Sequence, residues 1–181
     1  INKKLNILFI GKIIKEKGIF DLLKVFIQLT KEYKDFAFNL KIVGDGQDKE
    51  NLITHIKLYN NIKYYGWIDN EDKLKDIFDD SNLLICPTKP GYPEGVPRVI
   101  DEAINLYKLV IASKVGGITK EFEKNPPLIL FEGGNLSSLK KSIEEIMNNN
   151  TDLKQIYKNI NFRIKDGSGA ADQHIDLLNS H

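Results

Sequence analysis

Short apolar runs alternate with helix-like stretches along this chain, and that order restricts the possible folds more than any other feature of the sequence. Several runs are apolar throughout, as expected of strands buried on both faces of a parallel sheet. The expected strands are residues 6–10, 40–43, 62–65, 83–86, 109–112 and 128–131. A repeated strand–helix order produces right-handed crossovers, so the sequence predicts an α/β fold: a Rossmann-like, doubly wound parallel sheet of about six strands with helices on both faces.

The expected helices each show one apolar stripe at three- and four-residue spacing. The stripe of the first helix runs from Ile19 through Phe26 to Tyr33. The others are expected around residues 52–59, 71–80, 97–106, 117–124 and 139–147. Pro97 falls in the first turn of its helix, where a missing N–H group has no intrahelical partner to lose.

The length of 181 residues suits one domain, because domains typically hold roughly 100 to 200 residues. The polar tract at 148–152 indicates a linker. The sequence KDGSGAADQ at 165–173 indicates a flexible joint before a last helix at 170–178. We therefore expect one domain at 1–165, and the joint and C-terminal helix at 166–181. A strand pattern begins after only four residues, so we also expect the chain to be part of a longer protein.

Charge and cysteine content argue against several classes of protein. The 26 basic and 25 acidic residues nearly cancel, whereas a nucleic-acid-binding surface normally has a basic excess, so no nucleic-acid partner is expected. The single cysteine, Cys86, permits no internal disulfide and favours a reducing compartment. Because it ends a strand-like run, we interpret it as a buried structural thiol. No apolar stretch approaches the ~18 residues of a membrane span, and no secretory signal is visible.

The carboxyl ends of the strands are where an open α/β sheet binds its ligands. The first strand is followed by GKIIKEKG, in which Gly11 allows close backbone approach and Lys12 and Lys17 lie five residues apart. Two ammonium groups beside a helix N-terminus favour an anion. The alternative, that both lysines are solvated surface residues, remains open.

The second and third strands are followed by weaker signals. Gly44 and Gly46 flank an aspartate in a turn that can admit a ligand, although a plain strand-to-helix turn explains it equally well. The three spaced glycines of a dinucleotide-binding fingerprint are missing, so a nicotinamide cofactor is not supported. Trp67 and Ile68 can line a slot for a base, or the tryptophan can pack in the core or at its rim. Asn70 is a candidate helix cap.

The fourth strand is followed by CPTKPGYPEGVPRVIDEA, which holds two glutamates. Glu94 lies in a Pro/Gly loop, where the backbone N–H groups of Gly95 and Val96 can face the same ligand. Glu102 lies inside the next helix, and because Glu94 precedes that helix both carboxylates can face one cleft. A carboxylate accepts two hydrogen bonds without donating any, which suits the vicinal hydroxyls of sugars and ribose.

A metal site is the competing interpretation of the two glutamates. It is not favoured, because none of the three histidines lies near this motif and the sequence has no Asp-x-Asp stretch. After the fifth strand, Gly116 and Gly117 open another helix, which predicts a further group of N–H donors near a phosphate.

These motifs, in the order FIGKIIKEKG, IVGDG, YYGWID, EGVPRVIDEA and SKVGGITKE, resemble the C-terminal, donor-binding domain of retaining GT-B glycosyltransferases of family 4, the glycosyl transferases of group 1. The likeness runs from about Asn6 to Asn149. It implies an enzyme that transfers a sugar from a UDP- or GDP-sugar to an acceptor with retention, without a bound metal or other cofactor, in polysaccharide or glycolipid synthesis.

The resemblance also implies roles for matching positions. Lys12 and Lys17 would hold the donor diphosphate and stabilise the leaving group, and Glu94 would bind hydroxyls of the donor sugar. Glu102 would bind the ribose, and the backbone of Ile68 would contact the base beside Trp67. The remaining positions expected to line the nucleotide-sugar site are Gly11, Gly44, Gly46, Gly95, Val96, Gly116 and Gly117.

Several positions depart from the pattern of that family. Lys12 stands where arginine is usual, which keeps the charge but loses the two-pronged hydrogen-bonding geometry. Pro97 stands where glycine is common and Lys114 where aspartate is common. The sequence INLYK at 104–108 replaces a stretch of small residues, and TKPGYP at 88–93 makes a slightly long loop before Glu94.

A further departure concerns the acceptor. The GT-B fold has two similar halves, and the half that holds most of the acceptor site is not in this sequence. We therefore expect a saccharide or lipid-linked acceptor to bind through that N-terminal domain, and the 181 residues alone to bind donor without turnover. A cytoplasmic location is expected, with contact to the inner face of the membrane only through the other half. Two alternatives remain open: a nucleotide-sugar epimerase or phosphorylase of similar fold, and a non-catalytic nucleotide-binding module.

Overall fold

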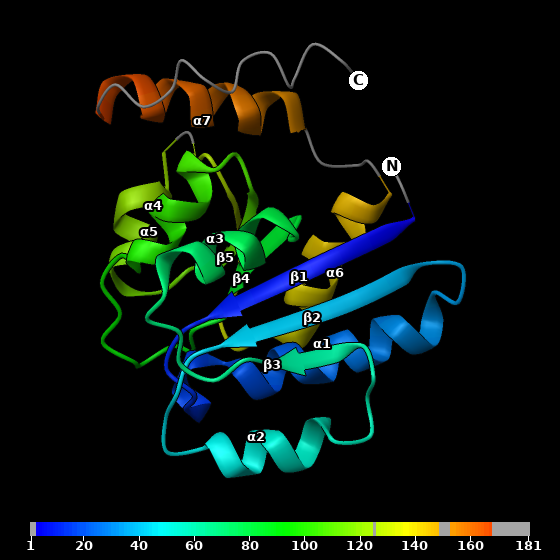
Figure 1. Ribbon diagram of the computed structural model, residues 1–181. Helices are drawn as coiled ribbons and strands as arrows, with labels where there is room; N and C mark the ends of the chain where they lie inside the picture. Colours follow the sequence, from blue (N-terminus) through cyan, green and yellow to red (C-terminus); the bar gives the residue numbers. More distant parts are fainter. Residues whose placement is uncertain (1–2, 125, 149–152, 168–181) are drawn as a thin grey trace.

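The residues that the computed structural model describes, 3–124, 126–148 and 153–167, form one six-stranded parallel sheet in the order β3-β2-β1-β4-β5-β6 (Figure 1). Its strands are β1 (Lys4–Ile10), β2 (Ala37–Val43), β3 (Ile62–Tyr64), β4 (Leu83–Cys86), β5 (Leu109–Ser113) and β6 (Ile129–Phe131). The predicted fold is confirmed, and each strand ends within one residue of its expected carboxyl end. The strand order reverses between β1 and β4, which pair through Ile7–Leu83 and Leu8–Leu84.

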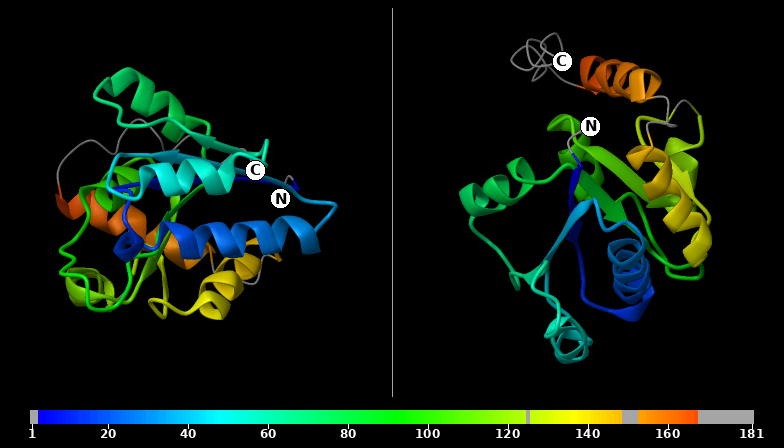
Figure 2. Two further views of the ribbon diagram at one scale, coloured as in Figure 1. Left: turned by 90° about the horizontal axis from the view of Figure 1, so that it is seen from below. Right: turned by 90° about the vertical axis from the view of Figure 1, so that its right-hand side faces the viewer.

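Helices cover both faces of the sheet, as Figures 1 and 2 show. One face carries α1 (Ile19–Glu32), α2 (Lys49–Ile56) and α6 (Leu136–Met147), and the other carries α3 (Glu71–Asp79), α4 (Arg98–Asn105), α5 (Gly116–Phe122) and α7 (Leu153–Gly167). A short 3-10 helix, η1 (Lys15–Lys17), precedes α1. The apolar stripe predicted for the first helix is buried in the core, except for Tyr33, which is half-buried at the end of the helix. In the described part of the chain, no helix combines the length and the apolar character needed to cross a membrane.

Helix α7 was not expected from the sequence. One of its faces is buried against the domain through Ile156, Ile160 and Ile164. On a neighbouring face, the Arg163 guanidinium bonds Asp101 of α4 at 3.0 Å and Glu121 of α5 at 2.9 Å. The flexible joint predicted to begin at 165 is therefore wrong at its start, because residues 165–167 continue this helix. The rest of that joint, the predicted last helix and residues 149–152 of the linker lie outside the described residues.

Other element boundaries shift slightly from their predicted positions. Pro97 is the N-cap residue of α4 rather than a residue of its first turn, with φ −62° and ψ 126°. Asn70 is confirmed as a helix cap, since its side-chain oxygen accepts a hydrogen bond of 2.8 Å from the backbone N–H of Lys73. The cap fixes the point at which the turn after β3 enters α3.

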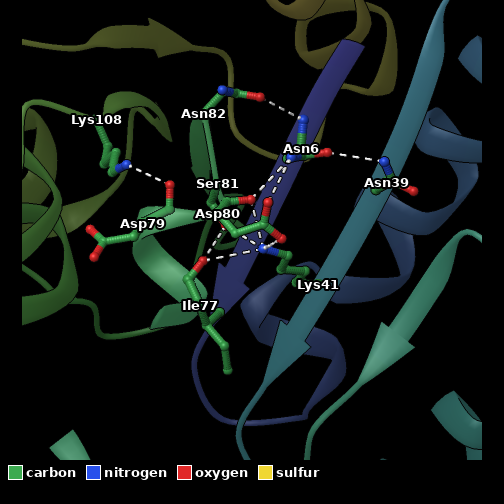
Figure 3. A network of polar contacts seen from close by, with 9 residues as sticks. All are labelled: Asn6, Asn39, Lys41, Ile77, Asp79, Asp80, Ser81, Asn82 and Lys108. Carbon is green, nitrogen blue, oxygen red and sulfur yellow. Dashed lines mark hydrogen bonds and ion pairs between the residues drawn. The ribbon is translucent and has the colours of Figure 1, made fainter. Parts of the chain in front are cut away.

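A polar network holds the other end of α3 against β1 and β2 (Figure 3). The buried Lys41 ammonium, in β2, donates to the carbonyl of Asp80 at 2.6 Å and pairs with the Asp80 carboxylate at 2.6 Å. Lys108 donates to the carbonyl of Asp79 at 3.2 Å. The last carbonyls of a helix lack intrahelical partners and carry partial negative charge, so these two cations stabilise the helix end.

Candidate functional site

The loops that follow β1 and β4 meet where the strand order reverses. Lys17, at the end of η1, forms an ion pair and hydrogen bond with Glu94, from the loop between β4 and α4. The two side chains are only 18% and 9% exposed. Ligands of open α/β sheets bind at this edge and at this reversal. Of the three residues that the resemblance assigns to catalysis, Lys12, Lys17 and Glu94, the structure thus brings Lys17 and Glu94 together.

Two further residues, which the sequence reasoning missed, complete the surroundings of the ion pair. The buried Thr88 hydroxyl donates a 2.8 Å hydrogen bond to Glu94 Oε2, the same oxygen that Lys17 contacts. The ring of Tyr92 lies with its centroid 5.1 Å from Lys17 Nζ. Glu94 Oε1 makes no hydrogen bond within the described residues, so it can accept one from a ligand. Thr88 and Tyr92 both belong to the TKPGYP stretch. Its unusual length was the one sequence feature that could have indicated that this loop contributes to the site.

The glycines after β2 pack against the loop after β1. Gly44 has φ +137°, and a Cβ there would lie 1.9 Å from the carbonyl oxygen of Gly11. A Cβ on Gly46 would lie 2.4 Å from the carbonyl oxygen of Ile13, whose N–H in turn bonds the carbonyl of Asp45 at 2.8 Å. Contact between the two loops is enough to require glycine at both positions. A role in lining a ligand site remains a prediction for them.

The glycine pair at the start of α5 holds the backbone of Glu94. Gly117 N–H donates to the Glu94 carbonyl at 2.8 Å, so this donor is used inside the protein and is not free for a phosphate. A Cβ on Gly116, where φ is +47°, would lie 2.3 Å from the same carbonyl oxygen. The glutamate is therefore fixed through its carbonyl by α5 and through its side chain by Thr88 and Lys17.

The side chains of four other predicted site residues make no hydrogen bond or ion pair with this cluster within the described residues: Lys12, Trp67, Ile68 and Glu102. Lys12 and Glu102 are exposed, and neither forms an ion pair in that part of the chain. Trp67 is 74% exposed, which rules out the alternative that it packs in the core. Ile68 is buried in the core, so only its backbone is available to a ligand. The two residues that follow Glu94 in the sequence differ in burial: Gly95 is exposed and Val96 is half-buried.

Acidic and cysteine or histidine side chains do not cluster in a way that could hold a metal, as far as the described residues extend. At the reversal of strand order, a cation and an anion, Lys17 and Glu94, are instead in direct contact. Such a pair, with a carboxylate oxygen still open, can offer positive charge to an anion and a hydrogen-bond acceptor to a hydroxyl-rich group.

Comparison with known families decides where the chain belongs. The sequence model of the family described as glycosyl transferases group 1 matches residues 1–162. The chain belongs to this family. A curated relative, the putative teichuronic acid biosynthesis glycosyltransferase TuaC of Bacillus subtilis, is 30% identical over 122 residues, which is 67% of this chain and 28% of that protein. The chain spans between 28% and 41% of the length of the first curated relatives that it matches.

Solved structures of group 1 glycosyltransferases and related proteins share the fold. Alr3699/HepE of Anabaena, in complex with UDP, superposes with a TM-score of 0.68 at 21% identity, covering 87% of this chain and 43% of that one. The C-terminal domain of the glycosyl transferase group 1 family protein LpcC of Francisella tularensis superposes with a TM-score of 0.64 at 20% identity, covering 86% of this chain and 80% of that one. The fold is thus that of one half of a GT-B glycosyltransferase.

Proposed function

We propose that this chain is the donor-binding half of a retaining glycosyltransferase, and that its ligand is a nucleoside diphosphate sugar. The observation that carries the proposal is the contact between Lys17 and Glu94 at the reversal of strand order. A diphosphate needs positive charge, and the adjoining sugar needs hydrogen-bond acceptors. One contact between a cation and a carboxylate places both requirements side by side.

In this proposal each residue acts on one part of the donor. Lys17, with Lys12, binds the diphosphate and stabilises the negative charge that develops as the bond from sugar to phosphate breaks. Glu94 accepts hydrogen bonds from sugar hydroxyls through its open oxygen, and Gly95 and Val96 offer backbone N–H groups. Glu102 binds the ribose. The departing phosphate takes the proton of the acceptor hydroxyl on the same face, so configuration is retained. No metal is needed, because the lysines and helix ends neutralise the diphosphate.

The names of the similar proteins support a nucleotide and a polysaccharide context. The Anabaena structure contains UDP, and the Bacillus protein is named for teichuronic acid biosynthesis. We infer that the base is uracil or guanine, and that a saccharide or lipid-linked acceptor binds to a part of the enzyme outside these 181 residues. Transfer would then require that part, on the cytoplasmic side, whereas donor binding would not.

The test is a calorimetric titration of the chain with UDP, GDP and their sugars, without divalent metal. The variants are Lys17→Ala and Glu102→Ala, and Lys15→Ala is the matched control, because it removes an exposed lysine from the same short helix. We expect one nucleotide to bind, both site variants to weaken it about tenfold or more, and the control to stay near wild type. Binding that neither site variant weakens would contradict the assigned site, and the absence of binding to all of these ligands would contradict the donor-binding proposal.

A second experiment separates transfer from the two alternatives. The longer protein is incubated with donor, with and without acceptor, as wild type and as Glu94→Ala. Transfer that depends on acceptor and disappears in Glu94→Ala supports the glycosyltransferase. A changed sugar without acceptor would indicate an epimerase, and binding without any product would indicate a non-catalytic module.

A further inference from the structure

We propose that Tyr92 is a positioning residue that holds the Lys17 ammonium in place for the donor diphosphate. The inference rests on the proposed function, and it concerns a residue that the resemblance to the family did not assign. Tyr92 contacts both charged residues of the site. Its ring centroid lies 5.1 Å from Lys17 Nζ, and its carbonyl accepts a 2.8 Å hydrogen bond from the N–H of Glu94.

The loop is built to bring this ring back over Lys17. Its first part is tied to the elements after β1, because Lys89 N–H donates to the carbonyl of Glu16 at 2.8 Å and the Lys89 ammonium pairs with Asp21 at 3.0 Å. Gly91 then adopts φ +86°, a left-handed conformation that favours glycine. A Cβ at this position would meet no atom within 4 Å, so the backbone conformation, and not crowding, favours glycine here. That turn sends Tyr92 towards the lysine.

The chemistry of the contact suits a phosphate-binding lysine. The face of an aromatic ring attracts a cation through its quadrupole and carries no net charge. A second carboxylate at the same place would also hold Lys17, but it would repel an incoming diphosphate. The ring therefore restricts a flexible four-carbon side chain while leaving its positive charge available to the ligand.

The contact itself can be tested without any ligand. Protons of the Lys17 ε-methylene should show an upfield ring-current shift in the NMR spectrum of the chain, with the signals assigned by their loss in Lys17→Met. The shift should persist in Tyr92→Phe and disappear in Tyr92→Leu, which has no aromatic ring. An unshifted Lys17 in the wild type, or a shift that survives in Tyr92→Leu, would overturn the inference whether or not the protein binds nucleotide.

The positioning role is tested by a double-mutant cycle, titrated with whichever of UDP and GDP the wild type binds. We expect Tyr92→Leu to weaken binding about threefold to tenfold and Tyr92→Phe by less than about twofold. In the Lys17→Met background, Tyr92→Leu should have almost no further effect, because the group on which it acts is gone. Urea midpoints of all variants show whether each has folded.

Each outcome of the cycle bears on one claim. A loss in Tyr92→Leu that is equally large with and without Lys17 would mean a merely structural role and would reject the inference. Tighter binding in Tyr92→Leu would mean that the ring holds Lys17 away from the ligand, which also rejects it. A wild-type chain that shows the ring-current shift but binds neither nucleotide would reject the proposed function and leave the contact established.

Discussion

The Lys17 ammonium and the Glu94 carboxylate, 77 residues apart in the sequence, are in direct contact across the loops that follow β1 and β4. A site that must hold a carboxylate close to a diphosphate needs a cation between them, because two anions in a poorly solvated site repel each other strongly. In the proposed function Lys17 is that cation, because its ammonium contacts the Glu94 carboxylate directly. The pair then offers positive charge to the diphosphate and a carboxylate oxygen to the sugar.

Replacing Thr88 by valine should loosen Glu94 without changing the packing. The buried Thr88 hydroxyl donates to Glu94 Oε2, and a hydrogen bond to a charged group contributes about 1.5–3 kcal/mol. Lys17 still pairs with the same oxygen, so we expect Thr88→Val to lower the free energy of unfolding by about 1–2 kcal/mol and to weaken donor binding. Urea unfolding and calorimetric titration measure the two effects.

The matched control for this change is Thr54→Val. The Thr54 hydroxyl donates to the carbonyl of Glu50, one turn earlier on the exposed surface of α2, far along the chain from the site. It should change the unfolding free energy by less than about 0.5 kcal/mol and leave donor affinity as it is. If the two threonine substitutions lowered the unfolding free energy and the donor affinity equally, the hydrogen bond to Glu94 would contribute no more than a surface hydrogen bond.

Substitution of Gly44 by alanine should destabilise the fold, because a Cβ there would overlap the carbonyl oxygen of Gly11 and the backbone has φ +137°. We expect a loss of about 2–4 kcal/mol of unfolding free energy. Gly95→Ala is the control, since a Cβ on Gly95 meets no atom within 4 Å. It should remain within about 0.5 kcal/mol of wild type, so a similar loss in both variants would contradict this explanation.

Much of the fold could be predicted because its signals are local. Uniformly apolar runs such as the one that forms β4 identify buried strands, and the stripe of α1 has a clear helical period. Helix α7 was missed although Ile156, Ile160 and Ile164 are spaced by four residues. The residues between them are mostly polar, and the polar tract before the helix and Gly167 and Gly169 near its end are typical of a linker and a flexible joint.

The candidate site was less predictable because its contacts are not local. The strand-end rule placed Lys17 and Glu94 at the same edge of the sheet, but no spacing rule predicts a contact between residues so far apart in the sequence. Loop packing supplied another reason for Gly44 and Gly116, which the sequence could only associate with a ligand. The contacts of Thr88 and Tyr92 depend on how one loop turns back, which neither periodicity nor composition encodes.

Cys86 should be unreactive in the folded protein. Burial raises the pKa of its thiol to about 12, so almost none is ionised near pH 8, and thiol reagents attack the thiolate. We expect labelling in native buffer at least about a thousandfold slower than in denaturant. Ser137→Cys adds an exposed thiol on α6, so only the added thiol of this variant should react at once. Rapid labelling of native wild type would show that the end of β4 opens readily.

Removing the Lys41 cation should destabilise the end of α3. Its ammonium is the partner of the Asp80 carbonyl and carboxylate, and methionine can fill the space but cannot donate. We expect Lys41→Met to lower the unfolding free energy by about 1–3 kcal/mol at pH 7. Lys49→Met, which removes only an exposed pair with Asp45, should change it by less than about 0.5 kcal/mol. Comparable losses in both variants would contradict a specific role for the buried cation.

The stabilising effect of Lys41 should also depend on pH. Its hydrogen bond lowers the pKa of Asp80, so the contribution of the pair is complete above the unfolded-state pKa of about 4 and is lost as pH falls through the lower folded-state value. The difference in unfolding free energy between wild type and Lys41→Met should therefore narrow as the pH falls from 6 to 3. In an Asp80→Asn background, which cannot titrate, the same difference should stay constant. A difference that widens in acid, or narrows equally without the carboxylate, would assign the pH dependence to other groups.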